Sequence, residues 1–189
     1  MTCRCSTCGE VHDDLPGMGL DYPDYYFSVP EEERDSRIEL TSDTCIINNE
    51  DFFIRGVIEL PVNDYPQVFG LGVWVSQKKE NFCTYLQNFD SDKIGPFFGW
   101  LSNSIAYYSE DTLSLQTMAH FRSGGLRPWI ELDSTDHPLA IDQRDGISLA
   151  KAWEIVHFYN ILDSHPRCGH LLTATFVLPL PVSRSTGGG

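Results

Sequence analysis

Hydrophobic and polar residues alternate along two long stretches in the first half of the chain. The strand predicted at residues 51–62 has one apolar face, formed by Phe52, Ile54, Ile58 and Leu60. The strand predicted at 68–76 repeats the pattern, and its apolar face contains Phe69, Leu71, Val73 and Val75. A third strand is predicted at 37–47, and the polar "NNED" sequence that follows it is typical of a hairpin turn. Three consecutive strands with short connections indicate an antiparallel meander.

Helical periodicity appears in two longer segments and one short one. Apolar residues recur at helical spacing in residues 76–89, where Ser76 is the expected N-cap. The same spacing in residues 147–160 predicts a helix that is capped by Ser148. A shorter helix is expected behind Pro30, because three glutamates follow it and acidic residues favour a helix N-terminus.

The remaining segments complete the predicted fold. Residues 112–133 are typical of a second hairpin, whose Ser-Gly-Gly turn tolerates positive φ angles. The aromatic stretch at 95–108 is compatible with a buried loop followed by either a short strand or a short helix. We therefore expect an α+β fold, with a mainly antiparallel sheet and helices packed on one face. Residues 1–160 form the predicted domain and begin with a Cys/His knuckle and loop at 1–20. Residues 161–189 are expected to form a poorly ordered extension.

The composition is that of an acidic globular protein. The chain has 189 residues, enough for one domain, and its 27 acidic and 13 basic residues give a formal net charge of -14. Most of the excess negative charge falls in the first third of the sequence, which argues against nonspecific binding to nucleic acids or anionic membranes. The same charge favours a basic protein partner or cations. No apolar stretch is long enough to span a membrane and no signal segment is apparent, so a cytoplasmic location is expected.

Cysteine and histidine residues cluster close to the start of the chain. Cys5 and Cys8 form a C-x-x-C pair, and His12 follows four residues later, a spacing that zinc hairpins use. A structural zinc site takes four ligands in a tetrahedron, so a fourth ligand must come from elsewhere. Cys45, in the predicted strand "SDTCII", is the preferred candidate, and Cys3 is the local alternative.

Two other interpretations of this cluster remain open, a reduced terminus without metal and a redox pair. The redox interpretation is disfavoured because the C-x-x-C motif does not follow a strand and open a helix, the arrangement that lowers a thiol pKa in such enzymes. A catalytic zinc ion is also disfavoured, because thiolate-rich sites usually leave no open coordination position. Structural zinc is therefore the expected cofactor.

Polar residues in the second half suggest a candidate pocket. His120 and Arg122 share the polar face of their predicted strand, and we expect them to line a pocket with Trp129 and His137. His137 lies among acidic residues in "STDHPLAIDQRDG", which is compatible with a general base but is also common in turns. The sequence contains no nucleophile elbow, phosphate-binding loop or dinucleotide fingerprint, so it predicts no coherent catalytic set.

Several stretches together resemble a known family. They include "CSTCGEVHDDLP", "DYYFSVPEEER", "EDFFIRGVIELPV", "GVWVS", "GPFFGWL" and "RPWIELDSTDHPLA". Over about residues 5–160 the chain resembles the bacterial domain family of unknown function DUF2199. That family has a similar C-x-x-C-G segment and a cysteine in its "SDxC" strand, which matches Cys45, whereas Cys3 falls outside the pattern. The resemblance implies a bacterial domain and leaves its activity open.

These observations favour a cytoplasmic binding or interaction domain in which a zinc knuckle fixes the N-terminus to the sheet. One alternative is an acidic protein of the immunity type, which would neutralise a basic toxin. Another is a hydrolytic enzyme built around His137 or His120. The sequence leaves a small-molecule ligand open.

Overall fold

The computed structural model describes residues 3–4, 11–12 and 15–162, with side chains between 15 and 159. Its strands are β1 (Cys3–Arg4), β2 (Val11–His12), β3 (Met18–Gly19), β4 (Ile38–Leu40), β5 (Thr44–Ile47), β6 (Asp51–Leu60), β7 (Phe69–Gln77), β8 (Phe97–Trp100), β9 (Gln116–His120) and β10 (Trp129–Leu132). Its helices are the 3-10 helices η1 (Asp24–Ser28) and η2 (Glu31–Glu33) and the α-helices α1 (Arg34–Arg37), α2 (Lys79–Gln87), α3 (Pro138–Asp145) and α4 (Leu149–Leu162).

The long antiparallel pair β6 and β7 forms the centre of the sheet. The two strands are in register from Phe52 opposite Gln77 to Leu60 opposite Phe69. β5 pairs with β6 through the turn at Asn48 and Asn49, whose φ angles are both positive, as a tight hairpin turn requires. The predicted meander of three antiparallel strands is therefore confirmed.

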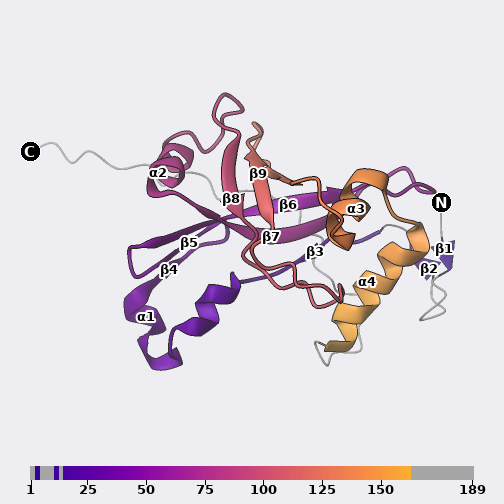
Figure 1. Ribbon diagram of the computed structural model, residues 1–189, viewed down its shortest axis with the longest axis horizontal. Helices are drawn as coiled ribbons and strands as arrows, with labels where there is room; N and C mark the ends of the chain where they lie inside the picture. Colours follow the sequence, from indigo (N-terminus) through magenta and orange to yellow (C-terminus); the bar gives the residue numbers. More distant parts are fainter. Residues whose placement is uncertain (1–2, 5–10, 13–14, 163–189) are drawn as a thin grey trace, which may run out of the picture.

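The sheet curls into a ring of five strands. Its strand order is β3-β7-β6-β10-β9-β8, and β8 returns to β7 through a bridge between Leu101 and Val75. In Figure 1, β8 and β9 cross steeply over β6 and β7, as this closure demands. β10 runs parallel to β6 and β3 runs parallel to β7, whereas the other pairs are antiparallel. The fold is therefore α+β, with a mixed and mainly antiparallel sheet.

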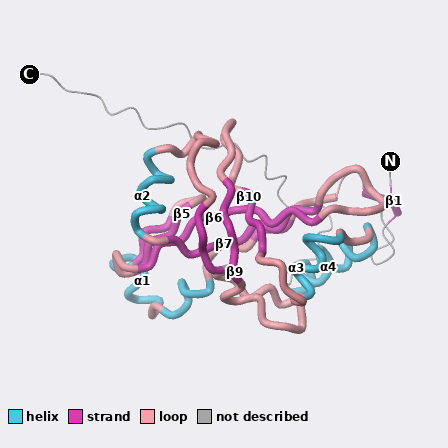
Figure 2. The backbone as a smooth tube through the Cα atoms, turned by 45° about the horizontal axis from the view of Figure 1, so that its top comes forward, coloured by secondary structure: helices cyan, strands magenta, loops and turns pink. Residues whose placement is uncertain are grey.

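The main hydrophobic core fills the inner side of this ring. All five strands of the ring contribute to it, because period-two alternation sends every second side chain inward. The inward residues include Val75, Ile54, Ile130, Ala119 and, just after β8, Leu101, each no more than 1% exposed. Helix α2 adds Phe82, and helices α3 and α4 add Leu139 and Trp153. Figure 2 shows α2 at one end of the sheet and α3 with α4 at the other.

A smaller core lies on the outer side of β5, β6 and β7. It consists of Val29, Cys45, Ile47, Phe53 and Trp74, with Ile38 packed against it. The segment from η1 to α1 covers this part of the sheet, and the rings of Tyr25 and Phe53 are 5.6 Å apart. The rest of the outer side, over β8, β9 and β10, carries exposed aromatic residues.

Two boundary predictions are wrong. The strand predicted at 37–47 is divided into β4 and β5, because the Thr41 hydroxyl accepts hydrogen bonds from the Asp43 and Thr44 amides and closes a turn. Ser76 does not cap the following helix, because it still belongs to β7; α2 begins after Lys78, which makes no side-chain cap bond. Ser148 does cap α4, since its Oγ accepts the Lys151 amide at 3.1 Å.

Helix α3 occupies a segment in which the sequence indicated a turn. His137 is its N-cap and Pro138 its first residue, a position where proline suits a helix because its missing amide has no intrahelical partner. Helix α4 continues to Leu162, whereas the predicted domain ends at 160 and the predicted extension begins at 161. The poor order predicted for that extension concerns residues that lie, from 163 onward, outside the described part of the chain. Within the described residues, no helix has the length and apolar character of a membrane span.

Candidate functional site

An exposed aromatic surface lies on the outer side of β8, β9 and β10. The register places Phe98 opposite Met118 and His120 opposite Trp129, so these four residues share one side of the sheet. Trp100, two residues after Phe98, lies on the same side. Phe98 and Trp100 are 40% and 43% exposed, and their rings meet edge to face with centroids 5.1 Å apart. We call Phe98, Trp100, Met118, His120 and Trp129 the aromatic face.

Acidic side chains border the aromatic face on β10. Glu131 follows Trp129 on the same side of the strand, and its Oε2 lies 2.7 Å from Nε2 of His120. The His120 ring also packs on the Trp129 ring, with centroids 4.7 Å apart. Just beyond the strand, Asp133 is exposed and its amide bonds the carbonyl of Gln116, the residue opposite Trp100. The face therefore combines large rings with a negative border.

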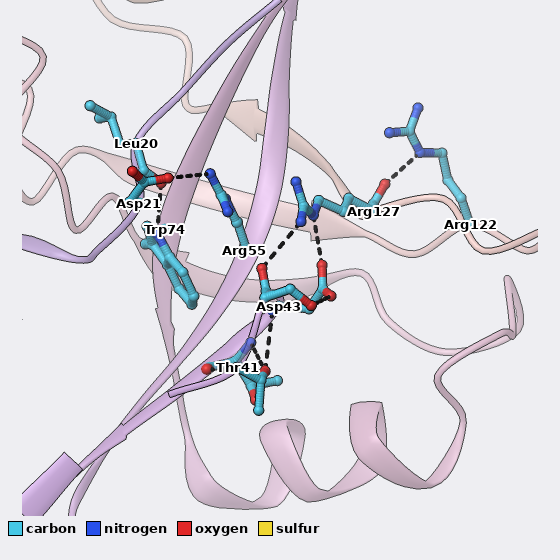
Figure 3. A network of polar contacts seen from close by, with 10 residues as sticks. Leu20, Asp21, Thr41, Asp43, Arg55, Trp74, Arg122 and Arg127 are labelled. Carbon is cyan, nitrogen blue, oxygen red and sulfur yellow. Dashed lines mark hydrogen bonds and ion pairs between the residues drawn. The ribbon is translucent and has the colours of Figure 1, made fainter. Parts of the chain in front are cut away.

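Figure 3 shows a network of arginine side chains that starts at Arg122, two residues after His120, and reaches Asp43 in the turn between β4 and β5. Arg122 donates to Glu59 Oε1 at 2.6 Å and, through Nε, to the Arg127 carbonyl at 2.8 Å. Arg127 in turn donates to Asp43 Oδ1 at 2.6 Å, and this ion pair is nearly buried, with side chains 12% and 5% exposed. These bonds attach the turn between β9 and β10 to the β4–β5 hairpin.

Arg55 lies beside this network on β6. Its guanidinium lies 5.8 Å from the Trp74 ring and 3.5 Å from Asp21, whose side chain is 80% exposed. Burial, and next the neighbouring charge of Arg127, lower the pKa of Arg55 below its usual value. Figure 3 also shows the Trp74 indole donating to the Leu20 carbonyl, at 3.0 Å. These contacts hold the segment after β3 against the sheet.

Three of the four residues predicted to line a pocket lie close together. His120 and Trp129 belong to the aromatic face, and Arg122 lies just beyond β9. His137 lies elsewhere, because α3 packs on the inner side of the sheet, through Leu139. Its Nδ1 accepts the Leu139 amide at 3.1 Å, while its buried Nε2 has no hydrogen-bond partner within the described residues.

The Tyr108 ring lies 6.3 Å from the ring of His137, and its hydroxyl belongs to a structural polar cluster with Asp142 and Lys151. The Tyr108 hydroxyl donates to Asp142 at 2.8 Å, and the Lys151 ammonium lies 2.7 Å from the same carboxylate. Burial, and then the negative charge of Asp142, raise the pKa of Tyr108. Lys151 neutralises Asp142, so this cluster joins α3 to α4, and among the described residues no carboxylate hydrogen-bonds to the His137 side chain.

The predicted metal ligands are only partly within the described residues. Cys5 and Cys8 lie outside them, and His12 is described by its backbone in β2, where it pairs with Cys3 in β1. Cys45 is fully buried, and burial raises the pKa of its thiol to about 12. In Figures 1 and 2, the N-terminal hairpin and β5 lie at opposite ends of the molecule. No group of three or more potential ligands occurs among the described residues.

Sequence reasoning did not identify Phe98 and Trp100 as site residues. In "GPFFGW" both residues of interest stand beside other apolar residues, so the alternation of a half-exposed strand is hidden. Gly99 between them occupies an inward position where a side chain would fall on the Ser76 carbonyl. The sequence signal that could have identified Phe98 and Trp100 is the pair of aromatic residues on either side of Gly99.

Comparisons with known proteins show the family of this chain. The fold and the site define an α+β domain with a curled sheet and an exposed aromatic face. The chain belongs to the family described as an uncharacterized protein conserved in bacteria (DUF2199), whose sequence profile matches residues 4–147. The predicted resemblance is thus confirmed. No curated protein and no solved structure matches the chain.

Proposed function

We propose that this protein is an interaction domain that binds a basic segment of a partner protein on the aromatic face. The observation that carries the proposal is the exposure of Phe98 and Trp100 in one contiguous surface with His120 and Trp129. Exposed patches of large apolar side chains are typical of interaction sites, and tryptophan is prominent among the residues that dominate binding energy.

Charge supports a basic partner. Glu131 and Asp133 border the aromatic face, and the whole chain has a formal charge of -14. An arginine or lysine of the partner can lie on an indole ring and reach a carboxylate at the same time. Long-range attraction between the acidic chain and a basic segment also accelerates their encounter. A nucleic acid or an anionic membrane would be repelled by the same charges.

A peptide titration tests this function. An arginine-containing peptide with leucine and tyrosine spacers is compared with the same peptide in which glutamate replaces each arginine. We expect the basic peptide alone to shift the amide resonances of β8, β9 and β10, with an affinity that falls as salt rises. Trp100→Ala is expected to weaken binding by about 2 kcal/mol, or roughly thirtyfold in Kd.

Leu86→Ala provides the matched control, because Leu86 is an apolar residue on α2 with a similar exposed fraction. This variant is expected to bind the peptide as the parent protein does. Equal binding of the acidic peptide, or an equal loss of affinity in Leu86→Ala, would contradict the proposal.

We infer in addition that the N-terminal cysteines hold a structural zinc ion, with Cys3 as the fourth ligand beside Cys5, Cys8 and His12. The pairing of Cys3 with His12 supports this set, because opposite residues of an antiparallel pair have Cα atoms about 4.5–5.5 Å apart. Cys45 suits the role less well, because its thiol resists ionisation in an apolar core and zinc requires the thiolate.

Metal analysis of the purified full chain tests this inference. Cys3→Ser is expected to lose the bound zinc, because three ligands hold a structural zinc ion weakly. Cys45→Ala is expected to retain it. Loss of zinc in Cys45→Ala but not in Cys3→Ser would assign the fourth ligand to Cys45 instead, and a parent protein without bound metal would refute the zinc site.

A further inference from the structure

A cavity of about 270 Å³ lies between the segment that follows β3, helix η1 and helix α4. Its walls include the aromatic side chains of Tyr22, Phe27 and Tyr159, the carboxylates of Asp21 and Asp24, and the amide of Asn103. The cavity is smaller than the roughly 300–1,000 Å³ that drug-sized ligands occupy, so its size suits a small molecule. It is a separate site from the aromatic face, since none of the five residues of that face lines it.

The carboxylate of Asp24 is held in a fixed orientation. One oxygen accepts a hydrogen bond from Nδ2 of Asn103 at 3.2 Å, and the other accepts the Ser104 amide at 2.8 Å. Asn103 is 1% exposed and is itself fixed by the Trp74 amide, which donates to its Oδ1 at 2.7 Å. An ionised carboxylate has about four acceptor positions, so Asp24 keeps capacity for a further donor.

The second carboxylate, that of Asp21, is weakly engaged. Its side chain is 80% exposed, and its contact with Arg55 is 3.5 Å long. Among the described residues no lysine or arginine lines the cavity, although Arg55 reaches Gly19 and Asp21 at its rim. Within the described residues the wall itself therefore has two carboxylates and no cation, while Arg55 and Arg34 lie beside it, and a wall with this charge favours a cation.

The aromatic wall suits a cation as well. The Tyr22 and Phe27 rings meet edge to face with centroids 5.8 Å apart, and the Tyr22 ring also stacks on Tyr26. The same cluster already receives one cation, because the Arg34 guanidinium lies 4.8 Å from the Tyr26 ring centroid and 5.7 Å from that of Phe27. Aromatic rings next to carboxylates are a known means of holding organic ammonium groups.

We propose that this cavity binds a small organic cation, an amine with an apolar group. The ammonium group lies between Asp21 and Asp24, and the apolar group packs on Tyr22, Phe27 and Tyr159. The site does not depend on the proposed binding of a basic partner, which uses a different surface.

Three matched probes test the proposal on the full chain: phenethylammonium, the neutral phenethyl alcohol and the anionic phenylacetate. Titrations at constant ionic strength are followed by the amide resonances of Leu20, Asp21 and Asn103. We expect phenethylammonium to shift these resonances saturably, the alcohol to bind at least fivefold more weakly, and phenylacetate to produce no shift. Because one charge pair at about 4 Å in water is worth about fivefold in affinity, Asp21→Asn should weaken the cation by about that factor.

Asp24→Asn provides a second variant with the same expected loss, and Glu32→Gln provides the control. Glu32 is exposed on η2, so its substitution removes one negative charge without altering the cavity. Equal binding of the three probes, shifts confined to residues away from the cavity, or the same loss in Glu32→Gln as in Asp21→Asn would each overturn the proposal. None of these results bears on peptide binding to the aromatic face, so the two proposals fail separately.

Discussion

At the scale of single residues, Arg127 and Asp43 form the least exposed ion pair among the described residues. Asp43 also accepts a bond from the Ser42 hydroxyl, and its carbonyl accepts the Arg55 amide at 2.8 Å. A buried charge is tolerated only while its partner and its hydrogen bonds remain in place. The pair therefore stabilises the connection between the β4–β5 hairpin and β10 only as a complete unit.

Asp43→Ala is expected to destabilise the protein by about 3–5 kcal/mol, because it removes the buried carboxylate that pairs with the nearly buried Arg127 guanidinium. Urea unfolding measures the change. Glu33→Ala is the control, since it removes the exposed pair with Arg37 and should cost no more than about 0.5 kcal/mol. Similar losses of unfolding free energy in both variants would show that the buried pair stabilises the protein no more than the exposed pair does.

At the scale of elements, β8 depends on one glycine. A side chain at Gly99 would fall on the Ser76 carbonyl and lie 2.7 Å from Nε2 of Gln77. Glycine at this position allows the backbone of β8 to approach β7 closely, and Trp100 then donates its amide to Ser76 Oγ at 3.2 Å. The closure of the ring and the position of the aromatic face both follow from this contact.

Gly99→Ala is expected to displace β8 from β7 and to lower the free energy of unfolding by about 1–3 kcal/mol. Chemical denaturation followed by tryptophan fluorescence reports both effects, because Trp100 adjoins the substitution. Phe98→Ala, on the same strand, removes an exposed side chain and should change stability by less than about 0.5 kcal/mol. If Gly99→Ala were as stable as the parent protein, the close approach of β8 would not be required for closure.

At the scale of the whole molecule, the sequence was sufficient to predict the α+β class, the central meander and the capped helix α4. These features depend on local patterns, such as the alternation in β6 and the Ser148 cap, which need no knowledge of distant residues. The ring closure depends on the contact of Leu101 with Val75, which no local pattern encodes. Helix α3 was missed because "TDHP" is equally compatible with a turn and with a helix N-terminus.

Only part of the candidate site could likewise be predicted from the sequence. Pairing within one hairpin brings His120 and Trp129 together, and the alternation in that hairpin indicated the common side of His120 and Arg122. Phe98 joins them through the pairing of β8 with β9. This pairing could be predicted only if the secondary structure of residues 95–108 were known. His137 was grouped with them only because its imidazole could act as a base, and the packing of α3 on the inner side of the sheet separates it from them.

The closed ring limits how a partner can attach. β8, which would otherwise be a free edge, is occupied by β9 on one side and by the bridge to β7 on the other. The strands that do end the described sheet are short, two residues in β3 and three in β4. A bound peptide thus has few main-chain groups with which to extend the sheet. If the aromatic face binds a peptide as proposed, recognition relies on the side chains of that peptide, and composition and charge select the partner rather than its ability to become an additional strand.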